Sequence, residues 1–122
     1  MTQGSGPVRG DVWLVRLPRA RGVEVQEDRP AAVVSSDVFA SIPLRIVVPL
    51  MSWRSGDEGR LNKVRIRRTA ANGLERDSSA DVLQVKSVST ERLIRRIGSL
   101  ESDLIEEIAA GIVIAVDYET LT

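Results

Sequence analysis

The chain has 122 residues, of which 43% are hydrophobic and 28% charged, as expected for a single soluble globular domain with one core. It contains no cysteine and no histidine, which excludes disulfides, thiolate chemistry and histidine acid–base catalysis. A zinc site is not expected either, because it would have to be built from carboxylates alone. We therefore expect no metal and no cofactor, and any catalysis must use arginine, lysine, carboxylate, hydroxyl or backbone groups.

The formal net charge is zero, with 17 basic and 17 acidic residues, but the charges are unevenly distributed. Residues 54–76 carry seven basic and three acidic side chains, whereas residues 99–122 carry six acidic and no basic ones. This asymmetry favours one face that binds an anionic partner. Neither a secretory signal nor an apolar run long enough to span a membrane is visible. We expect a cytoplasmic protein with a flexible segment at residues 1–7 and a single domain at residues 8–122.

Hydrophobic patterning predicts five short strands. The first is the β-rich run 11–17, which ends at Pro18, and the second is 30–35, where Pro30 must occupy the first position or an edge. Further strands are predicted at 44–50, 62–68 and 80–88, the last two from their period-two alternation. Polar loops are expected at 19–28 and 53–59, and Asn72-Gly73 indicates a turn.

The period then changes to that of helices. Ser89 or Thr90 can cap a short helix that ends before Gly98, and Ser99 can cap a longer one. The apolar face of the longer helix recurs at helical spacing in Leu104, Ile105, Ile108, Ile112 and Val116. Gly111 within this helix predicts close packing against a neighbour, because glycine otherwise costs about 1 kcal/mol there. The fold class is therefore α+β and mainly β, with a curled antiparallel sheet and a C-terminal helix.

Arg29 is the first candidate functional residue. It precedes Pro30 and is therefore held extended, and its guanidinium suits a phosphate and the charge that develops during phosphate transfer. Glu24 lies on the preceding loop, from which it could approach Arg29. The alternative is an ordinary surface ion pair beside the start of a strand.

The second candidate is a basic strand formed by Lys63, Arg65 and Arg67. Arg54, Arg60 and Lys86 are expected to extend its charge, and Trp53 lies on a loop where a nucleobase could stack. Such a surface could follow a nucleic-acid backbone. The alternative is a solvated edge strand whose charges prevent aggregation. Trp13, by contrast, is predicted to lie in the core or at a dimer contact.

Five short motifs occur in order along residues 9–116. They are Gly10-Asp11-Val12-Trp13, Gly22-x-Glu24 followed by Arg29-Pro30-Ala31, Val48-Pro49-Leu50-Met51-Ser52, Gln84-Val85-Lys86-Ser87, and Ile97-Gly98-x-Leu100. In this order and at this spacing they resemble the motifs of the MazF/PemK toxin family. The resemblance implies an SH3-like barrel of antiparallel strands with a C-terminal helix, of the CcdB/PemK/MazF type, and a homodimer.

The resemblance also implies an activity: sequence-selective cleavage of single-stranded RNA, such as mRNA, without a metal. The ribose 2′-OH is the nucleophile in that reaction, and the products are a 2′,3′-cyclic phosphate and a 5′-hydroxyl. Arg29 would stabilise the phosphorane, Glu24 would be the base, and Gln84 and Lys86 would contribute to RNA binding. The implied partner is an antitoxin whose acidic, disordered C-terminal segment folds on binding.

Two positions depart from the family pattern. Met51 occupies the place of the family's threonine, whose hydroxyl faces the scissile phosphate, and Ser52 is the nearest hydroxyl that could replace it. Leu83 occupies the place of a supporting carboxylate. Because the loss of one positioned donor costs about 10²–10³ in rate, a weakened relative that only binds antitoxin stays an alternative. A CcdB-like toxin that binds DNA gyrase, with target contacts from the C-terminal Tyr118 and Leu121, is another.

Overall fold

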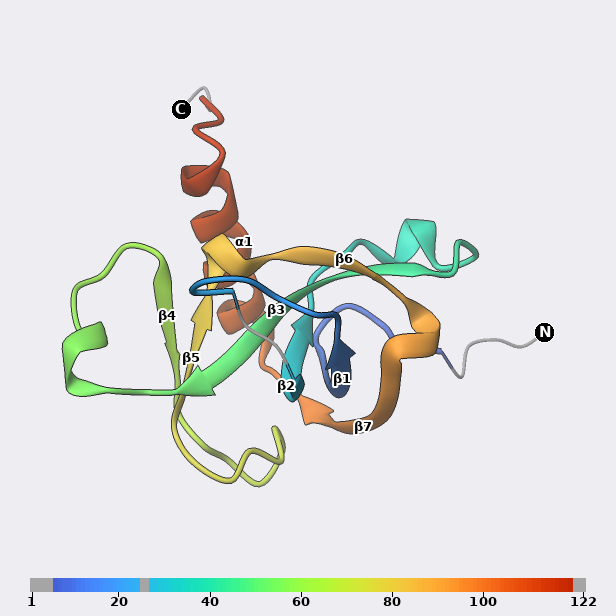
Figure 1. The fold of residues 1–122 in the computed structure, drawn as a ribbon, viewed down its shortest axis with the longest axis horizontal. Coiled ribbons are helices and arrows are strands. Elements are labelled where there is room, and N and C mark those ends of the chain that lie inside the picture. The colour runs from blue at the N-terminus through green and yellow to red at the C-terminus, as the bar shows by residue number, and fades with distance from the viewer. Residues whose placement is uncertain (1–5, 25–26, 120–122) are drawn as a thin grey trace.

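The computed structural model describes residues 6–24 and 27–119. This part of the chain contains seven strands, four 3₁₀ turns and one α-helix (Figure 1). The strands are β1 (Asp11–Leu17), β2 (Glu27–Val33), β3 (Leu44–Ser52), β4 (Lys63–Ile66), β5 (Ser78–Asp81), β6 (Lys86–Ser89) and β7 (Leu93–Ser99). The 3₁₀ turns are η1 (Asp37–Phe39), η2 (Ser55–Asp57), η3 (Val82–Gln84) and η4 (Thr90–Arg92), and the helix is α1 (Ser102–Ala115).

Every strand pairing is antiparallel, in the order β4-β5-β3-β2-β1-β7. The long strand β3 is central because it pairs with three partners along its length. Its first half pairs with β6, its middle with β2 and its last three residues with β5. Figure 1 shows the resulting sheet curling around β3, with α1 rising beside β4 and β5. The mainly β fold with a C-terminal helix is confirmed.

The sheet encloses two apolar clusters. The larger lies between the sheet and α1, where Ile105 and Ile108 pack with Val12, Ile66 and Val82. The smaller lies on the other side of β1, β2 and β3, and Trp13 and Met51 pack against it. The core role predicted for Trp13 is therefore confirmed in part: the ring is half-buried and its Nε1 donates to Asp11 at 3.0 Å.

The strand predicted at 80–88 is wrong, because the structure divides it into β5, η3 and β6. Asp81 caps the intervening turn by accepting a hydrogen bond from the Leu83 amide at 3.1 Å. Val82 turns into the core, and its amide donates to Asn62 O at 2.9 Å. The side-chain cap and the burial of Val82 thus override the alternating pattern.

The short helix predicted after Ser89 is also wrong. Ser89 does cap a turn, accepting from the Glu91 amide at 3.2 Å, but the turn is the single 3₁₀ turn η4. The chain then continues as β7, which pairs with β1. Hydrogen bonding to a neighbouring strand has overridden the local preference for helix.

The C-terminal helix starts at Ser102 and not after a Ser99 cap, because Ser99 belongs to β7 and its amide donates to Ala71 O at 3.0 Å. Val116 lies past the helix end and is 67% exposed, so it adds nothing to the apolar face. The close approach at Gly111 is confirmed: a Cβ there would lie 2.9 Å from Cγ1 of Val82.

The second strand begins earlier and ends earlier than predicted, at Glu27–Val33. Pro30 pairs with Leu14 of β1, while the pairing with β3 begins only at Ala31. At Pro30, β2 is therefore paired on one side only, with β1. This one-sided pairing agrees with the predicted edge position. Residues 1–5 of the segment predicted to be flexible lie outside the described residues, and the domain limits stay a prediction. No helix in the described ranges is long and apolar enough to cross a bilayer.

Candidate functional site

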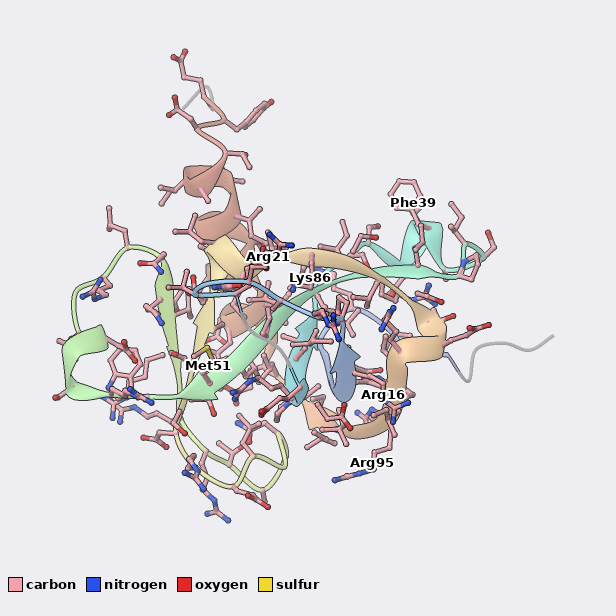
Figure 2. The ribbon with its side chains drawn as sticks, viewed as in Figure 1. Arg16, Arg21, Phe39, Met51, Lys86 and Arg95 are labelled. Atoms are coloured by element: carbon pink, nitrogen blue, oxygen red, sulfur yellow. The ribbon has the colours of Figure 1, made fainter. Side chains whose placement is uncertain are left out.

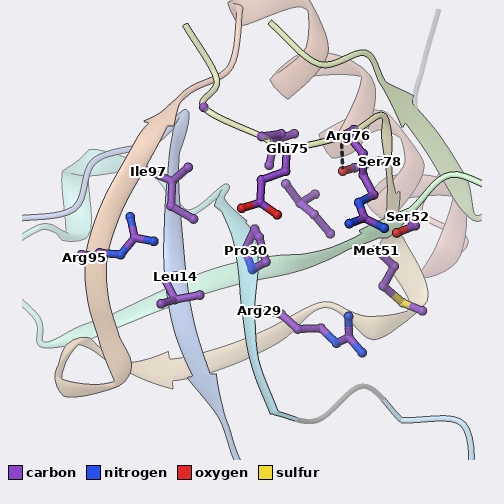
Figure 3. Close-up of a pocket in the computed structure, with 13 residues that line it drawn as sticks. Leu14, Arg29, Pro30, Met51, Ser52, Glu75, Arg76, Ser78, Arg95 and Ile97 are labelled. Carbon is purple, nitrogen blue, oxygen red and sulfur yellow. Dashed lines mark hydrogen bonds between the residues drawn. The ribbon is translucent and has the colours of Figure 1, made fainter. Parts of the chain in front are cut away.

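Arg29 lines a cavity of about 340 Å³ beside β1, β2 and β3 (Figure 3). Ser52, at the end of β3, lines the same cavity, as does Met51. The structure thus brings together two of the three predicted catalytic residues. Arg29 is half-buried, as expected of a side chain that emerges from a paired strand, and Ser52 is exposed.

The floor of the cavity is apolar because strand register sets one row of side chains on the same face. Leu14 of β1 stands opposite Pro30 of β2 on one side and opposite Arg95 of β7 on the other. Directly paired residues in adjacent strands point to the same face. Leu50, which is 2% exposed, extends the row into β3.

The charged side chains of the cavity are three arginines and one glutamate. Arg29 comes from β2 and Arg95 from β7, whereas Glu75 and Arg76 come from the loop between β4 and β5. The cavity carries an excess of positive charge and therefore favours an anion. The sequence motifs did not predict Glu75, Arg76 and Arg95 as site residues, because a loop and a strand distant from Arg29 in sequence supply them.

The loop that carries Glu75 and Arg76 is held in place by Asn72, which is 2% exposed. The Asn72 Oδ1 atom accepts from the amides of Thr69 and Leu74, both at 3.1 Å, and its Nδ2 donates to Arg67 O at 2.9 Å. The predicted Asn72-Gly73 turn is thus confirmed. Gly73 has φ +68°, and a Cβ there would collide with the carbonyl of Ile97. The loop is therefore seated tightly against β7.

Glu24 lies in a neighbouring cavity, not in the one that Arg29 lines. Its Oε1 accepts from the Arg21 amide at 2.6 Å, which fixes it to its own turn. Gln84 lines the same cavity and donates from Nε2 to Val23 O at 3.0 Å, and Lys86 lines it as well. Met51 borders both cavities and so lies between Glu24 and Arg29. In Figure 2, Met51 lies near the end of β3 and Lys86 lies on β6.

The basic strand does not present a row of unpaired cations. Lys63 lies 3.9 Å from Asp57 and 3.7 Å from Asp81. Both carboxylates are close to buried, so these contacts attach the loop after β3 to β5. Lys63 thus has a clear structural role, and its role in binding RNA stays a prediction. As the alternative interpretation supposed, β4 lies at the edge of the sheet within the described residues.

Arg65 connects the basic strand to Trp53. Its NH2 group lies 3.3 Å from Asp77, and its guanidinium lies 5.0 Å from the centre of the Trp53 ring. A hydrogen bond from the Arg68 amide lowers the pKa of Asp77 below its ordinary value of 3.8, and Arg65 and Arg67 lower it further. The ion pair with Asp77 positions the Arg65 guanidinium against the Trp53 ring. Arg54 and Arg67 are exposed.

Two further observations concern the chemistry available. In the ranges 6–24 and 27–119, no three acidic side chains come together to form a site that could hold a metal ion. Leu83, which the motif resemblance aligns with a supporting carboxylate, is 66% exposed and lines the Glu24 cavity, and Asp81 lines that cavity too. The Asp81 carboxylate is already engaged by Lys63, by Asn62 at 2.9 Å and by the Leu83 amide.

Comparison with known proteins agrees with this architecture. Residues 8–116 match the family described as PemK-like, MazF-like toxin of type II toxin–antitoxin system. The Endoribonuclease MazF9 of Mycobacterium tuberculosis is 35% identical to this chain, and the match covers 77% of this chain and 82% of that protein.

Two solved structures show the same fold. The toxin MazF-mt6 of Mycobacterium tuberculosis has a TM-score of 0.70 at 19% identity, over 90% of this chain and 99% of that one. An endoribonuclease from a mycobacterial species, solved in complex with its cognate antitoxin, has a TM-score of 0.73 at 14% identity, over 95% and 100% of the two chains. The chain therefore belongs to the PemK-like, MazF-like toxins of type II toxin–antitoxin systems.

Proposed function

We propose that this toxin is an endoribonuclease that cleaves single-stranded RNA at selected sequences without a metal ion. The observation that carries the proposal is the position of Arg29 in a cavity with an excess of positive charge, in a chain whose relative is named an endoribonuclease. A cavity with this charge attracts a phosphodiester, and a guanidinium on a paired strand is held ready for the charge that develops on it.

The reaction uses a nucleophile that belongs to the substrate. The 2′-oxygen attacks the adjacent phosphorus, the bond from phosphorus to the 5′-oxygen breaks, and a 2′,3′-cyclic phosphate and a 5′-hydroxyl result. The proton of the 2′-OH passes to a base, and the leaving 5′-oxygen gains one from Arg29 or from a water molecule that Arg29 orients. Arg29 also donates hydrogen bonds to the phosphorane oxygens, and Ser52 supplies the hydroxyl that Met51 lacks.

Glu24 is the proposed base. Because Met51 separates it from Arg29, it can act only on an RNA strand that lies across both cavities with the scissile phosphate near Met51. Gln84 and Lys86 would bind that strand within the Glu24 cavity. An RNA strand that fills both cavities places several bases in contact with the protein at once. These contacts would give the cleavage its sequence selectivity.

The other proposed RNA contacts surround the end of β3. Trp53 stacks a base on the ring face away from Arg65, whose charge and cation–π contact hold the ring in place. Arg54 and Arg67 are exposed and contact phosphates. Lys63 and Arg65 add to the positive field while their ion pairs fix the loop that carries Trp53.

The proposed partners are single-stranded RNA, a cognate antitoxin with an acidic C-terminal segment, and a second copy of the chain. A strip of exposed apolar side chains along η1 and the start of β3 supports the homodimer. It consists of Val38, Phe39, Ile42, Leu44 and Ile46, of which Phe39 is labelled in Figure 2. We place the activity in the cytoplasm, where mRNA is available, and in a single domain spanning residues 8–122.

The test is cleavage of a long RNA that lacks secondary structure, with EDTA present, followed by mapping of the new ends by primer extension. We expect discrete cuts with 5′-hydroxyl ends. Arg29→Ala and Arg29→Lys should both lose the cuts, because lysine lacks the planar fork of donors. Arg92→Ala, an exposed arginine outside both cavities, is the matched control and should cut normally.

Cuts that persist in Arg29→Ala would contradict the proposed role of Arg29. If the unaltered protein does not cut, Met51→Thr tests whether the missing hydroxyl is the cause. Restored cutting would identify a weakened member of the family, and continued inactivity would refute the nuclease proposal. RNA affinity should also fall with salt, with a logarithmic slope of about −0.7 for each phosphate contacted.

A further inference from the structure

We propose that the cavity beside Arg29 is a guanine-binding pocket in which Glu75 and Arg95 recognise the base of a nucleotide next to the cleaved bond. The inference rests on the proposed function only in supposing that RNA is the ligand. The pocket has two ends in Figure 3. Arg29, Arg76 and Ser52 lie at one end, Arg95 and Ile97 at the other, and the Glu75 carboxylate points over Pro30 between them.

The shape and lining of the pocket suit one nucleobase. Its volume of about 340 Å³ is at the small end of the range for ligand sites, roughly 300–1,000 Å³. The floor row of Leu14, Pro30 and Leu50 offers an apolar surface to the face of a base. The end of the pocket with Arg29 and Arg76 offers positive charge to a phosphate attached to the same nucleotide.

The polar groups select guanine among the four bases. A carboxylate accepts two hydrogen bonds side by side, and guanine presents two adjacent donors, N1–H and the N2 amino group. A guanidinium pairs with the O6 and N7 acceptors of guanine, which lie on a different edge of the base. Glu75 and Arg95 approach from different walls of the pocket, the loop and β7, so they can contact two different edges. Adenine and cytosine each present one amino group, and uracil one N–H.

The pocket is built before any ligand binds. Asn72 fixes the loop through three side-chain hydrogen bonds, and Leu74, which is 5% exposed, anchors it in the core next to Glu75. Within the described residues, neither Glu75 nor Arg95 takes part in an ion pair. Their charges are therefore available to a ligand, and a fixed loop lowers the entropic cost of binding it.

The test measures binding with RNA that cannot be cut. Seven-nucleotide 2′-O-methyl oligonucleotides of uridine carry guanine, adenine, cytosine or hypoxanthine at the central position, and fluorescence anisotropy gives each Kd. The methyl group removes the nucleophile, so the result does not depend on catalysis. The proteins compared are the unaltered chain, Glu75→Gln, Arg95→Gln and, as the matched control, Glu91→Gln, which changes an exposed glutamate outside the pocket.

We expect the guanine oligonucleotide to bind at least about tenfold more tightly than the adenine and cytosine ones. Glu75→Gln should weaken guanine binding by about 10- to 100-fold, the effect of losing hydrogen bonds to a charged group, and should leave adenine binding nearly unchanged. Hypoxanthine, which lacks the N2 amino group, should bind the unaltered protein about tenfold more weakly than guanine. Replacing N7 of guanine by carbon should weaken binding to the unaltered protein but not to Arg95→Gln.

Equal binding of all four oligonucleotides, or guanine preference that survives in Glu75→Gln, would overturn the inference. Because Glu75 is exposed, its substitution should leave the thermal unfolding curve unchanged, which separates a lost contact from a lost fold. If neither the unaltered protein nor Met51→Thr cuts RNA, while guanine preference and its loss in Glu75→Gln are observed, the pocket stands and the nuclease proposal is refuted. If the RNA is cut and guanine preference is absent, the nuclease proposal stands and the guanine pocket is refuted.

Discussion

Replacing Asn72 with alanine should destabilise the protein and loosen the loop that carries Glu75 and Arg76. The Asn72 side chain is almost fully buried and makes three hydrogen bonds, to the amides of Thr69 and Leu74 and to Arg67 O. Alanine makes none of them and leaves three backbone groups without their partners. Because Leu74 is itself buried, water can replace its lost bond only if the loop moves.

The expected cost follows from the number of bonds. A hydrogen bond in a folded protein contributes about 1 kcal/mol net, so losing three lowers the free energy of unfolding by about 3 kcal/mol. For a domain of this size, that loss corresponds to a fall in Tm of roughly 10 °C. Asn62→Ala is the matched control, because its side chain makes a single hydrogen bond, from Nδ2 to the charged Asp81 carboxylate at 2.9 Å, and its loss should cost about 1.5 kcal/mol.

Urea denaturation followed by tryptophan fluorescence measures both losses. Hydrogen exchange of the Leu74 amide reports on the loop directly, and its protection should fall in Asn72→Ala more than protection in β1 does. An Asn72→Ala variant no less stable than Asn62→Ala would refute the reasoning, because the bonds to the loop would then contribute nothing. So would an unchanged protection of Leu74.

Two further predictions concern other parts of the fold. Gly111→Ala should lower the free energy of unfolding by about 1–3 kcal/mol despite the helix propensity of alanine, because the new Cβ would lie 2.9 Å from Cγ1 of Val82. In a Val82→Ala background the same change should cost less, and a double-mutant cycle that shows simple additivity would contradict this. The lowered pKa of Asp77, held chiefly by the Arg68 amide and then by Arg65, means that this carboxylate contributes stability above pH 3.8. That stability is lost as the pH falls through the lowered pKa, so Asp77→Asn should flatten the fall of Tm with pH below about pH 4. If Tm falls as steeply with pH in Asp77→Asn as in the unaltered protein, the proposed contribution of the Asp77 carboxylate is wrong.

Local sequence predicts a strand or helix correctly where its hydrophobic pattern agrees with the strands and core that it packs against. The strand before Pro18, the central strand through Val48 and the C-terminal helix were predicted correctly in kind. The errors at 80–88 and after Ser89 have one origin. In both places a side-chain cap, from Asp81 or from Ser89, ends the preceding element, and the neighbouring strands then decide which conformation follows.

The candidate site likewise has features that local sequence predicted and features that it did not. The sequence predicted Arg29, because the bond before Pro30 restrains it, and also predicted the turn at Asn72. It did not predict that Arg29 and Glu24 line separate cavities with Met51 between them. Nor did it predict that Lys63 and Arg65 are paired with carboxylates, because those contacts join residues up to 18 positions apart.

Residue types, their local period and short ordered motifs were enough to predict the class of fold, the family and the absence of histidine and cysteine chemistry. No local pattern predicted that Glu75 and Arg95 share a pocket with Arg29, because long-range contacts bring them together. The pairing of Leu14 with both Pro30 and Arg95, and the seating of the loop at Asn72 against β7, bring these residues together. Such juxtapositions depend on which strands become neighbours, and the burial of the whole core decides that.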